Sequence, residues 1–103
     1  MIHVIATINT RPGQRQTVLA ELLKVRPEVL NEVGCYQYLP LEDDPVVLPR
    51  QLPYRDNTVT MVEQWESVQH LEAHLATPHM QRYFAAVEPW VEEVSLQILR
   101  PGQ

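Results

Sequence analysis

Three of the four histidines in this chain of 103 residues lie close together in its second half. They are His70, His74 and His79, and Glu63 and Trp65 stand just before them. An imidazole has an ordinary pKa of about 6.5, so each ring could accept a proton or donate a hydrogen bond near neutral pH. This cluster therefore holds the residues of the chain best suited to acid–base chemistry.

A helix is expected to position the first two of these histidines. Ser67 can cap its N-terminus, and apolar residues then repeat at the spacing of one buried helix face: Val68, Leu71 and Leu75. At about 100° per residue, His74 lies at the flank of this face and is expected to look into a cleft beside the core. His70 lies nearly opposite and is expected to be solvated.

A second helix is expected to begin at Thr77-Pro78, because threonine is a good N-cap and proline suits the first helical position. His79 then falls in the first turn, where the positive end of the helix disfavours protonation. Apolar residues continue at helical spacing beyond it: Met80, Tyr83, Phe84, Val87 and Val91. Pro89 is expected to end or kink this helix.

Two other interpretations of the cluster stay open. In the first, His70, His74 and His79 bind a metal ion through nitrogen, and Glu63 completes the set; the orientation expected for His70 argues against it. In the second, His74 and His79 only hydrogen-bond to backbone groups at the break between the two helices. Trp65 likewise has a purely structural interpretation, as a core residue whose indole N–H binds a carbonyl.

Alternating apolar residues predict four strands, over residues 2–9, 35–41, 58–66 and 93–99. The first strand is apolar on both faces. One face of the third strand carries Val59, Met61, Glu63 and Trp65. The last strand is expected to point three apolar side chains inward: Val94, Leu96 and Ile98.

A long helix is predicted between the first two strands, from about Gln14. Pro27 should kink it or divide it, and Gly34 is a natural C-terminal cap. The resulting order β-α-β-β-α-α-β predicts an α+β ferredoxin-like sandwich, a four-stranded antiparallel sheet with helices on one face. A partner subunit is expected to cover the other face, since helices can cover only one.

Residues 42–57 form a long segment that is expected to be a loop, because Pro45, Pro49 and Pro53 exclude a central strand. It is nevertheless rich in apolar side chains: Val46, Val47, Leu48, Leu52 and Tyr54. It is either a flexible loop or an arm that packs against another part of the protein. We expect it to be partly ordered, near the mouth of the pocket or on a neighbouring subunit.

The composition indicates one globular domain over residues 1–103, with a net charge of −5 and no run of Lys or Arg. This charge argues against a nucleic-acid or anionic-membrane partner. No apolar stretch is long enough to span a bilayer, and no signal peptide is evident. Cys35 is the single cysteine and has no partner for an internal disulfide. A cytoplasmic protein is expected.

The cluster resembles the antibiotic biosynthesis monooxygenase family in the motif E-x-W-x-S-x(6)-H-x(3)-P-H, read from Glu63 to His79. Pro12-Gly13 and Gly34-Cys35-x-x-Tyr38 add to the resemblance, which covers nearly the whole chain. The resemblance implies a homodimer whose two sheets pack into an α/β barrel. In enzymatic members it implies a pocket between sheet and helices, where phenols or quinols are oxidised by dioxygen without metal, flavin or haem.

Departures from the family pattern indicate which branches of the family the chain resembles most. The asparagine, tyrosine and arginine that accompany the tryptophan in the polyketide-oxidising branch are Met61, Leu71 and Ala85 here. The haem-degrading branch has a tryptophan in place of His74 and a histidine in place of Phe84. The quinol-oxidising and small-metabolite branches fit best.

The sequence thus predicts a cofactor-independent monooxygenase for a small aromatic substrate. His74 would be the general base or orienting group, and Trp65 a wall of the pocket. The expected substrate-binding residues are His79, Tyr38, Tyr83, Phe84 and Glu63. The alternatives are an isomerase of a small metabolite and a non-catalytic ligand-binding dimer module.

Overall fold

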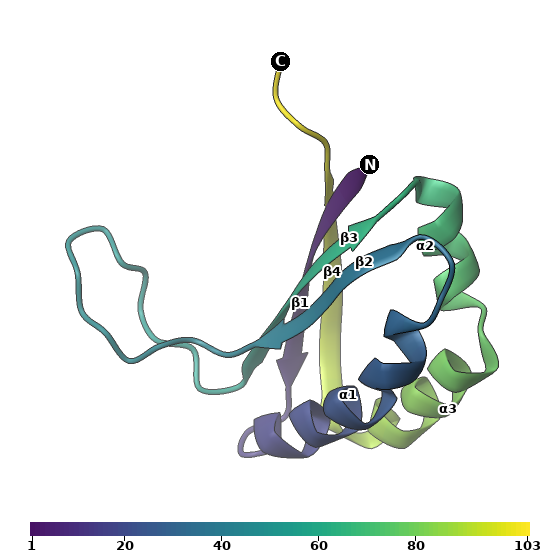
Figure 1. The fold of residues 1–103 in the computed structure, drawn as a ribbon. Coiled ribbons are helices and arrows are strands. Elements are labelled where there is room, and N and C mark those ends of the chain that lie inside the picture. The colour runs from purple at the N-terminus through teal and green to yellow at the C-terminus, as the bar shows by residue number, and fades with distance from the viewer.

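The computed structural model describes residues 1–103 as an antiparallel sheet with helices on one face (Figure 1). The strand order is β2-β3-β1-β4. The strands are β1 (Ile2–Thr10), β2 (Cys35–Leu41), β3 (Thr58–Trp65) and β4 (Val91–Leu99). The helices are α1 (Arg15–Leu30), α2 (Val68–Leu75) and α3 (Pro78–Val87), followed by the short 3₁₀ helix η1 (Glu88–Trp90). The predicted α+β ferredoxin-like sandwich is confirmed.

The two helices that carry the histidines begin where the sequence predicts. The side chain of Ser67 accepts a hydrogen bond from the backbone N–H of His70, and that of Thr77 accepts one from Met80, both at 3.3 Å. Each bond satisfies a donor that the first helical turn leaves unpaired. Pro78 occupies the first helical position, so local sequence alone specifies the break between α2 and α3.

The first helix continues through Pro27 without being divided, and four buried side chains hold it on the face toward the sheet: Val18, Leu22, Val25 and Val29. It ends earlier than expected, because Asn31 and not Gly34 is its C-cap. Gly34 has a φ of 82° and turns the chain into β2, where its carbonyl accepts a hydrogen bond from Glu66 at 2.8 Å.

The edge strand β4 is less covered than predicted. Val94, Leu96 and Ile98 pair with Ile8, Ala6 and Val4, whose side chains are buried on the face that carries the helices. The predicted direction of the three β4 side chains is therefore correct. They are nonetheless 55%, 47% and 45% exposed, because the helices leave this edge of the sheet open.

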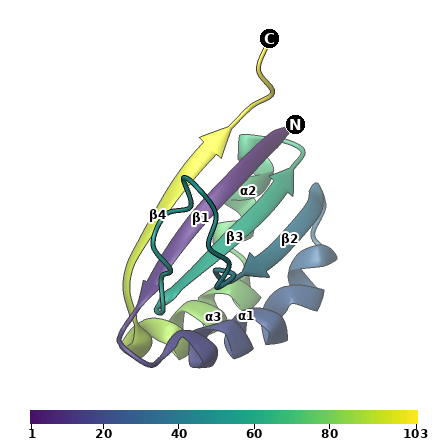
Figure 2. The ribbon, with the colours of Figure 1, turned by 90° about the vertical axis from the view of Figure 1, so that its left-hand side faces the viewer.

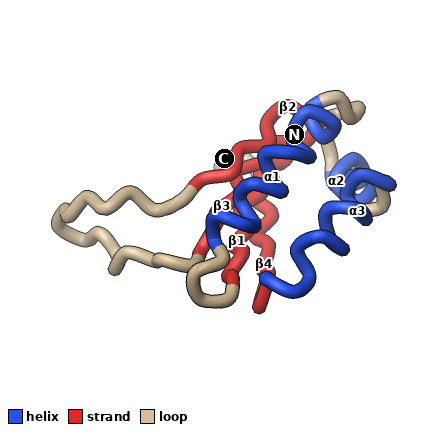
Figure 3. Tube along the Cα trace, turned by 90° about the horizontal axis from the view of Figure 1, so that it is seen from below, coloured by secondary structure: helices blue, strands red, loops and turns tan.

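Residues 42–57, between β2 and β3, contain no helix or strand and extend from the sheet on the side away from the helices (Figures 1 and 2). Figure 3 shows the same separation from below. An ion pair between Arg55 and Asp43 at 2.8 Å ties the two ends of this loop together. Val47 and Leu52 near its tip are 91% and 79% exposed. None of the helices is both long and apolar enough to cross a membrane.

We predict that Gly34→Ala destabilises the protein more than Gly13→Ala. Both glycines have positive φ, 82° and 79°, and forcing alanine into that region costs about 1–2 kcal/mol. A Cβ at Gly34 would additionally lie 2.6 Å from Cγ of His70, whereas a Cβ at Gly13 meets no atom. Urea unfolding of both variants measures the difference. Equal losses would contradict the steric argument, and Gly34→Ala combined with His70→Ala should recover the excess.

Candidate active site

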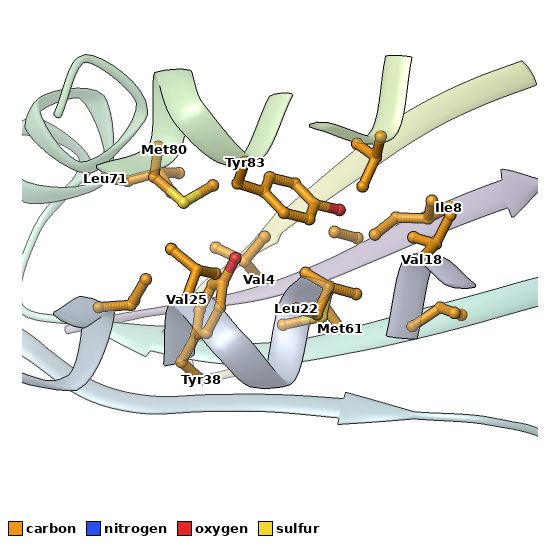
Figure 4. Packing of buried hydrophobic residues seen from close by; sticks show 14 of the residues in the cluster. Val4, Ile8, Val18, Leu22, Val25, Tyr38, Met61, Leu71, Met80 and Tyr83 are labelled. Carbon is orange, nitrogen blue, oxygen red and sulfur yellow. The ribbon is translucent and has the colours of Figure 1, made fainter. Parts of the chain in front are cut away.

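A pocket of about 270 Å³ lies between the sheet and the helices. Fourteen of its seventeen lining residues are hydrophobic, and the other three are Glu63, His74 and Glu88. Figure 4 shows Tyr38 from β2 and Tyr83 from α3 among the apolar side chains around it, together with Leu22 and Met61. The exposed β4 residues Val94 and Leu96 line it as well. It is an apolar site with few polar groups, as small-molecule pockets commonly are.

His74 is a buried imidazole that lines this pocket, with 2% of its surface exposed. Its Nδ1 lies 2.8 Å from Oε2 of Glu32. A carboxylate only accepts hydrogen bonds, so Nδ1 carries the hydrogen and Nε2 keeps its lone pair. Burial lowers the pKa of His74, and the neighbouring Glu32 opposes this effect without cancelling it. The ring is therefore neutral at pH 7 and able to accept a proton.

Aromatic rings hold the imidazole of His74 in place. The ring of Trp65 lies 4.6 Å from it, and the ring of Tyr38 meets it nearly edge-on at 5.3 Å, between centroids. Trp65 is fully buried and is not among the residues that line the pocket. It thus supports His74 from behind, and it does not form the wall that the sequence predicts.

Glu63 is a buried carboxyl group inside the pocket. Its Oε1 accepts a hydrogen bond from Nε1 of Trp65 at 2.9 Å. Burial raises the pKa of Glu63 to about 7, against the opposing effect of that hydrogen bond. Near neutral pH this group is therefore present both as a proton donor and as an acceptor.

Tyr38 and Tyr83 bring two phenol groups to the pocket, and neither hydroxyl makes a hydrogen bond within the chain. Burial raises the pKa of each phenol well above its usual value, so both stay protonated and can donate to a ligand. Phe84 lines the pocket beside Tyr83, with the two ring centroids 5.6 Å apart.

The other two histidines do not reach the pocket. His79 lies behind it, where its Nε2 is 2.8 Å from the same Glu32 oxygen that His74 binds. His70 is not fully solvated as expected: it is 31% exposed, contacts Ser67 through Nδ1 at 2.6 Å and packs over Gly34. His74 and His79 share Glu32 as a partner, whereas His70 contacts Ser67. No group of three or more His, Cys, Asp or Glu side chains is arranged to hold a metal ion.

Sequence reasoning missed Glu32. This residue lies in the turn after α1, 42 positions before His74 and 47 before His79. No periodicity or local motif connects it to the histidines, and only the packing of α1 against α2 and α3 brings the three together. The loop of residues 42–57 contributes no residue to the pocket of its own chain.

Comparisons with known proteins agree with the fold. A family model described as antibiotic biosynthesis monooxygenase matches residues 1–86. The protein named "Probable quinol monooxygenase YgiN" of Escherichia coli (strain K12) is 50% identical over 104 residues, which cover 99% of each chain. Among solved structures, PA3566 of Pseudomonas aeruginosa has a TM-score of 0.82 at 26% identity, over 99% of this chain and 94% of its own. Rv0793 of Mycobacterium tuberculosis has a TM-score of 0.79 at 24% identity, over 99% and 95%.

We predict that the contribution of Glu63 to the stability of the protein is lost as pH rises from below 4.5 to above 7. A carboxyl whose pKa is raised on folding favours the folded state while it is protonated, and this contribution is lost as pH rises through the folded value of about 7. A shift from 4.5 to about 7 corresponds to about 3 kcal/mol. Glu63→Gln keeps the oxygen that accepts from Trp65 and should remove this part of the pH dependence.

Urea unfolding at pH 5 and pH 8 measures this effect. Glu72→Gln is the matched control, because Glu72 is an exposed carboxylate on α2 and should leave the pH dependence unchanged. An equal pH dependence in the parent and in Glu63→Gln would show that Glu63 titrates normally.

Proposed function

Because the chain belongs to the antibiotic biosynthesis monooxygenase family, we propose that it oxidises a small hydroquinone or a related phenol with dioxygen. The observation that carries the proposal is a buried His74 that lines an apolar pocket and holds its Nδ1 against Glu32. The relative named as a quinol monooxygenase, 50% identical over the full chain, supports the same substrate class. A volume of about 270 Å³ suits one small ring system.

The proposed reaction begins with proton transfer from a substrate hydroxyl to Nε2 of His74. The resulting anion is electron-rich and reduces dioxygen. One oxygen atom bonds to a ring carbon that bears hydrogen, and the outer oxygen takes the proton of the second substrate hydroxyl. The C–H bond of that carbon and the O–O bond then break: the C–H proton passes to an oxygen of the product, and the departing hydroxide takes the proton from His74 and leaves as water. One hydroquinone and one dioxygen give one hydroxyquinone and one water, and four electrons pass from the ring to oxygen. The substrate supplies all the electrons, so the proposal needs no metal, flavin or haem.

The remaining polar groups have roles in binding. The protonated phenols of Tyr38 and Tyr83 can donate hydrogen bonds to the substrate oxygens. Glu63, with a pKa of about 7, can bind a hydroxyl group as either partner. Phe84 and the aliphatic lining exclude water, which strengthens these interactions and protects the reactive anion.

We predict that His74→Ala lowers turnover by about 10²–10⁴-fold, the range typical of a general base. Oxygen uptake is followed with a panel of hydroquinones, with and without a chelator. His70→Ala is the control, since His70 is a helix-borne histidine outside the pocket, and it should retain activity. Chelation should have no effect. The mechanism fails if no hydroquinone is oxidised above background, or if His74→Ala equals the parent.

We propose further that two copies of the chain associate through the sheet face that carries no helix. Ile5, Val62 and Leu39 pair across neighbouring strands on this face. The loop extends from the same side and exposes Val47 and Leu52. Exposed apolar side chains that lie together on one face are typical of an interaction site. The same surface on each copy would allow a two-fold dimer.

We predict a particle of twice the chain mass of 11.9 kDa in sedimentation at micromolar concentration. Val47→Asp places a charge on the loop tip without touching the core, and should weaken the dimer. Leu23→Asp is the matched control, because Leu23 is 53% exposed on α1. A monomeric parent would refute the dimer, and an unchanged dimer in Val47→Asp would refute the part played by the loop.

A further inference from the structure

Glu32 bonds two histidines through a single oxygen. Its Oε2 lies 2.8 Å from Nδ1 of His74 and 2.8 Å from Nε2 of His79. The Glu32 side chain is 11% exposed, and the two imidazoles are 2% and 15% exposed. Because the carboxylate only accepts, both rings must direct a hydrogen toward it. The turn after α1 is thereby joined to both α2 and α3.

The two histidines face different surroundings. His74 lines the apolar pocket, whereas His79 lines a separate cavity of about 110 Å³ between α1 and α3. Most residues of this second cavity are polar, and Nδ1 of His79 lies 3.7 Å from Oε2 of Glu28. Glu32 therefore stands between the buried base and a polar cavity, and His79 is the more exposed of its two partners.

We propose that Glu32 is the positioning residue of the catalytic base, and that His79 tunes the base through Glu32. The bond to Glu32 fixes the hydrogen of His74 on Nδ1, which leaves Nε2 as the proton acceptor in the pocket. The same carboxylate stabilises the imidazolium that forms when His74 takes a proton. This inference rests on the proposed function, because it assigns Glu32 and His79 to the same reaction.

The tuning follows from two donors that share one acceptor. A positive charge on His79 stands beside Glu32 and offsets its negative charge, so it opposes a positive charge on His74. The Glu32 contact raises the pKa of His74, while the charge of His79 lowers it. Removing Glu32 should thus lower the pKa of His74, and removing His79 should raise it.

Other charged and titratable groups lie near His74 and His79. Every variant retains them, so they do not change the predicted directions of the pKa shifts of His74. Near His74 they are Glu63 on β3, Tyr38 and Cys35 on β2, and Tyr83 on α3. Around His79 they are Glu21, Lys24, Glu28 and Arg82. Glu28 and Arg82 form their own ion pair at 2.8 Å, which limits their effect on His79.

A purely structural role for Glu32 predicts a different result. In that case the carboxylate only clamps the end of α1 to the two histidine helices. Its loss would lower the stability of the fold and leave the titration and tautomer of His74 in the folded protein unchanged. A measurement on the imidazole itself therefore separates the two roles.

The test records ¹H–¹⁵N correlations of the histidine side chains across a pH titration, without substrate, for the parent and three variants. Glu32→Gln should lower the pKa of His74 and weaken its preference for the Nδ1–H tautomer. His79→Ala should raise the pKa of His74. His79→Gln keeps an N–H that can donate to Glu32 but removes the charge, and should preserve the tautomer. Glu72→Gln removes an exposed carboxylate from α2 and should change nothing.

Oxygen uptake by the same proteins provides the second readout. Glu32→Gln should lower kcat/KM by about 10–100-fold, the usual cost of losing a partner that orients a histidine. The acidic limb of its pH profile should move to lower pH, and that of His79→Ala to higher pH.

Three results would overturn the inference: an unchanged His74 titration in both Glu32→Gln and His79→Ala, shifts in the same direction, or a parent with the hydrogen on Nε2. If Glu32→Gln does not fold, His79→Ala decides alone, and an unchanged titration in that variant overturns the proposal. The spectra need no turnover. A protein that shows the predicted shifts but oxidises no hydroquinone would refute the proposed function and leave the coupling of the two histidines established.

Discussion

The structure depends on the packing of α1, α2 and α3 against one face of the antiparallel sheet. Every second residue of β1 and β3 faces these helices, and burial of their side chains is the main favourable contribution to folding. The same packing encloses the pocket, whose lining belongs to both the sheet and the helices. Core and site are therefore one layer of the molecule, and a residue that faces the core can also face a ligand.

Glu63 and His74 are buried titratable members of this layer, and both line the pocket. Transfer of a carboxyl or an imidazole from water to an apolar interior is unfavourable unless hydrogen bonds compensate. Glu63 receives one bond from Trp65, and His74 makes one with Glu32. One bond each leaves both groups with displaced pKa values, and such groups in a pocket are common at sites of proton transfer. The apolar surroundings that stabilise the fold thus also shift the pKa values of Glu63 and His74.

Family membership restricts the reaction without choosing the substrate. Relatives of 26% and 24% identity keep the fold with TM-scores of 0.82 and 0.79, and a fold of this kind can support different activities. The features of this chain that bear on a substrate are local: two free phenols, one buried carboxyl and one oriented imidazole in an otherwise apolar pocket. The polar cavity that His79 lines is a second local feature, and its other lining residues lie outside the motif from Glu63 to His79.

The sequence by itself determined the strands, the helix starts at Ser67 and Thr77, and the inward face of β3. These features depend on residue spacing and on side chains that bond to backbone a few positions away, so local information is enough. Only the tertiary structure decided that Gly34 turns the chain and does not cap α1, that His70 packs over it, and that β4 stays partly open. It also decided the environment of His74, because Glu32 reaches that ring across 42 positions of chain. A contact of that kind exists only after α1 has packed against α2 and α3, and nothing in the local sequence encodes it.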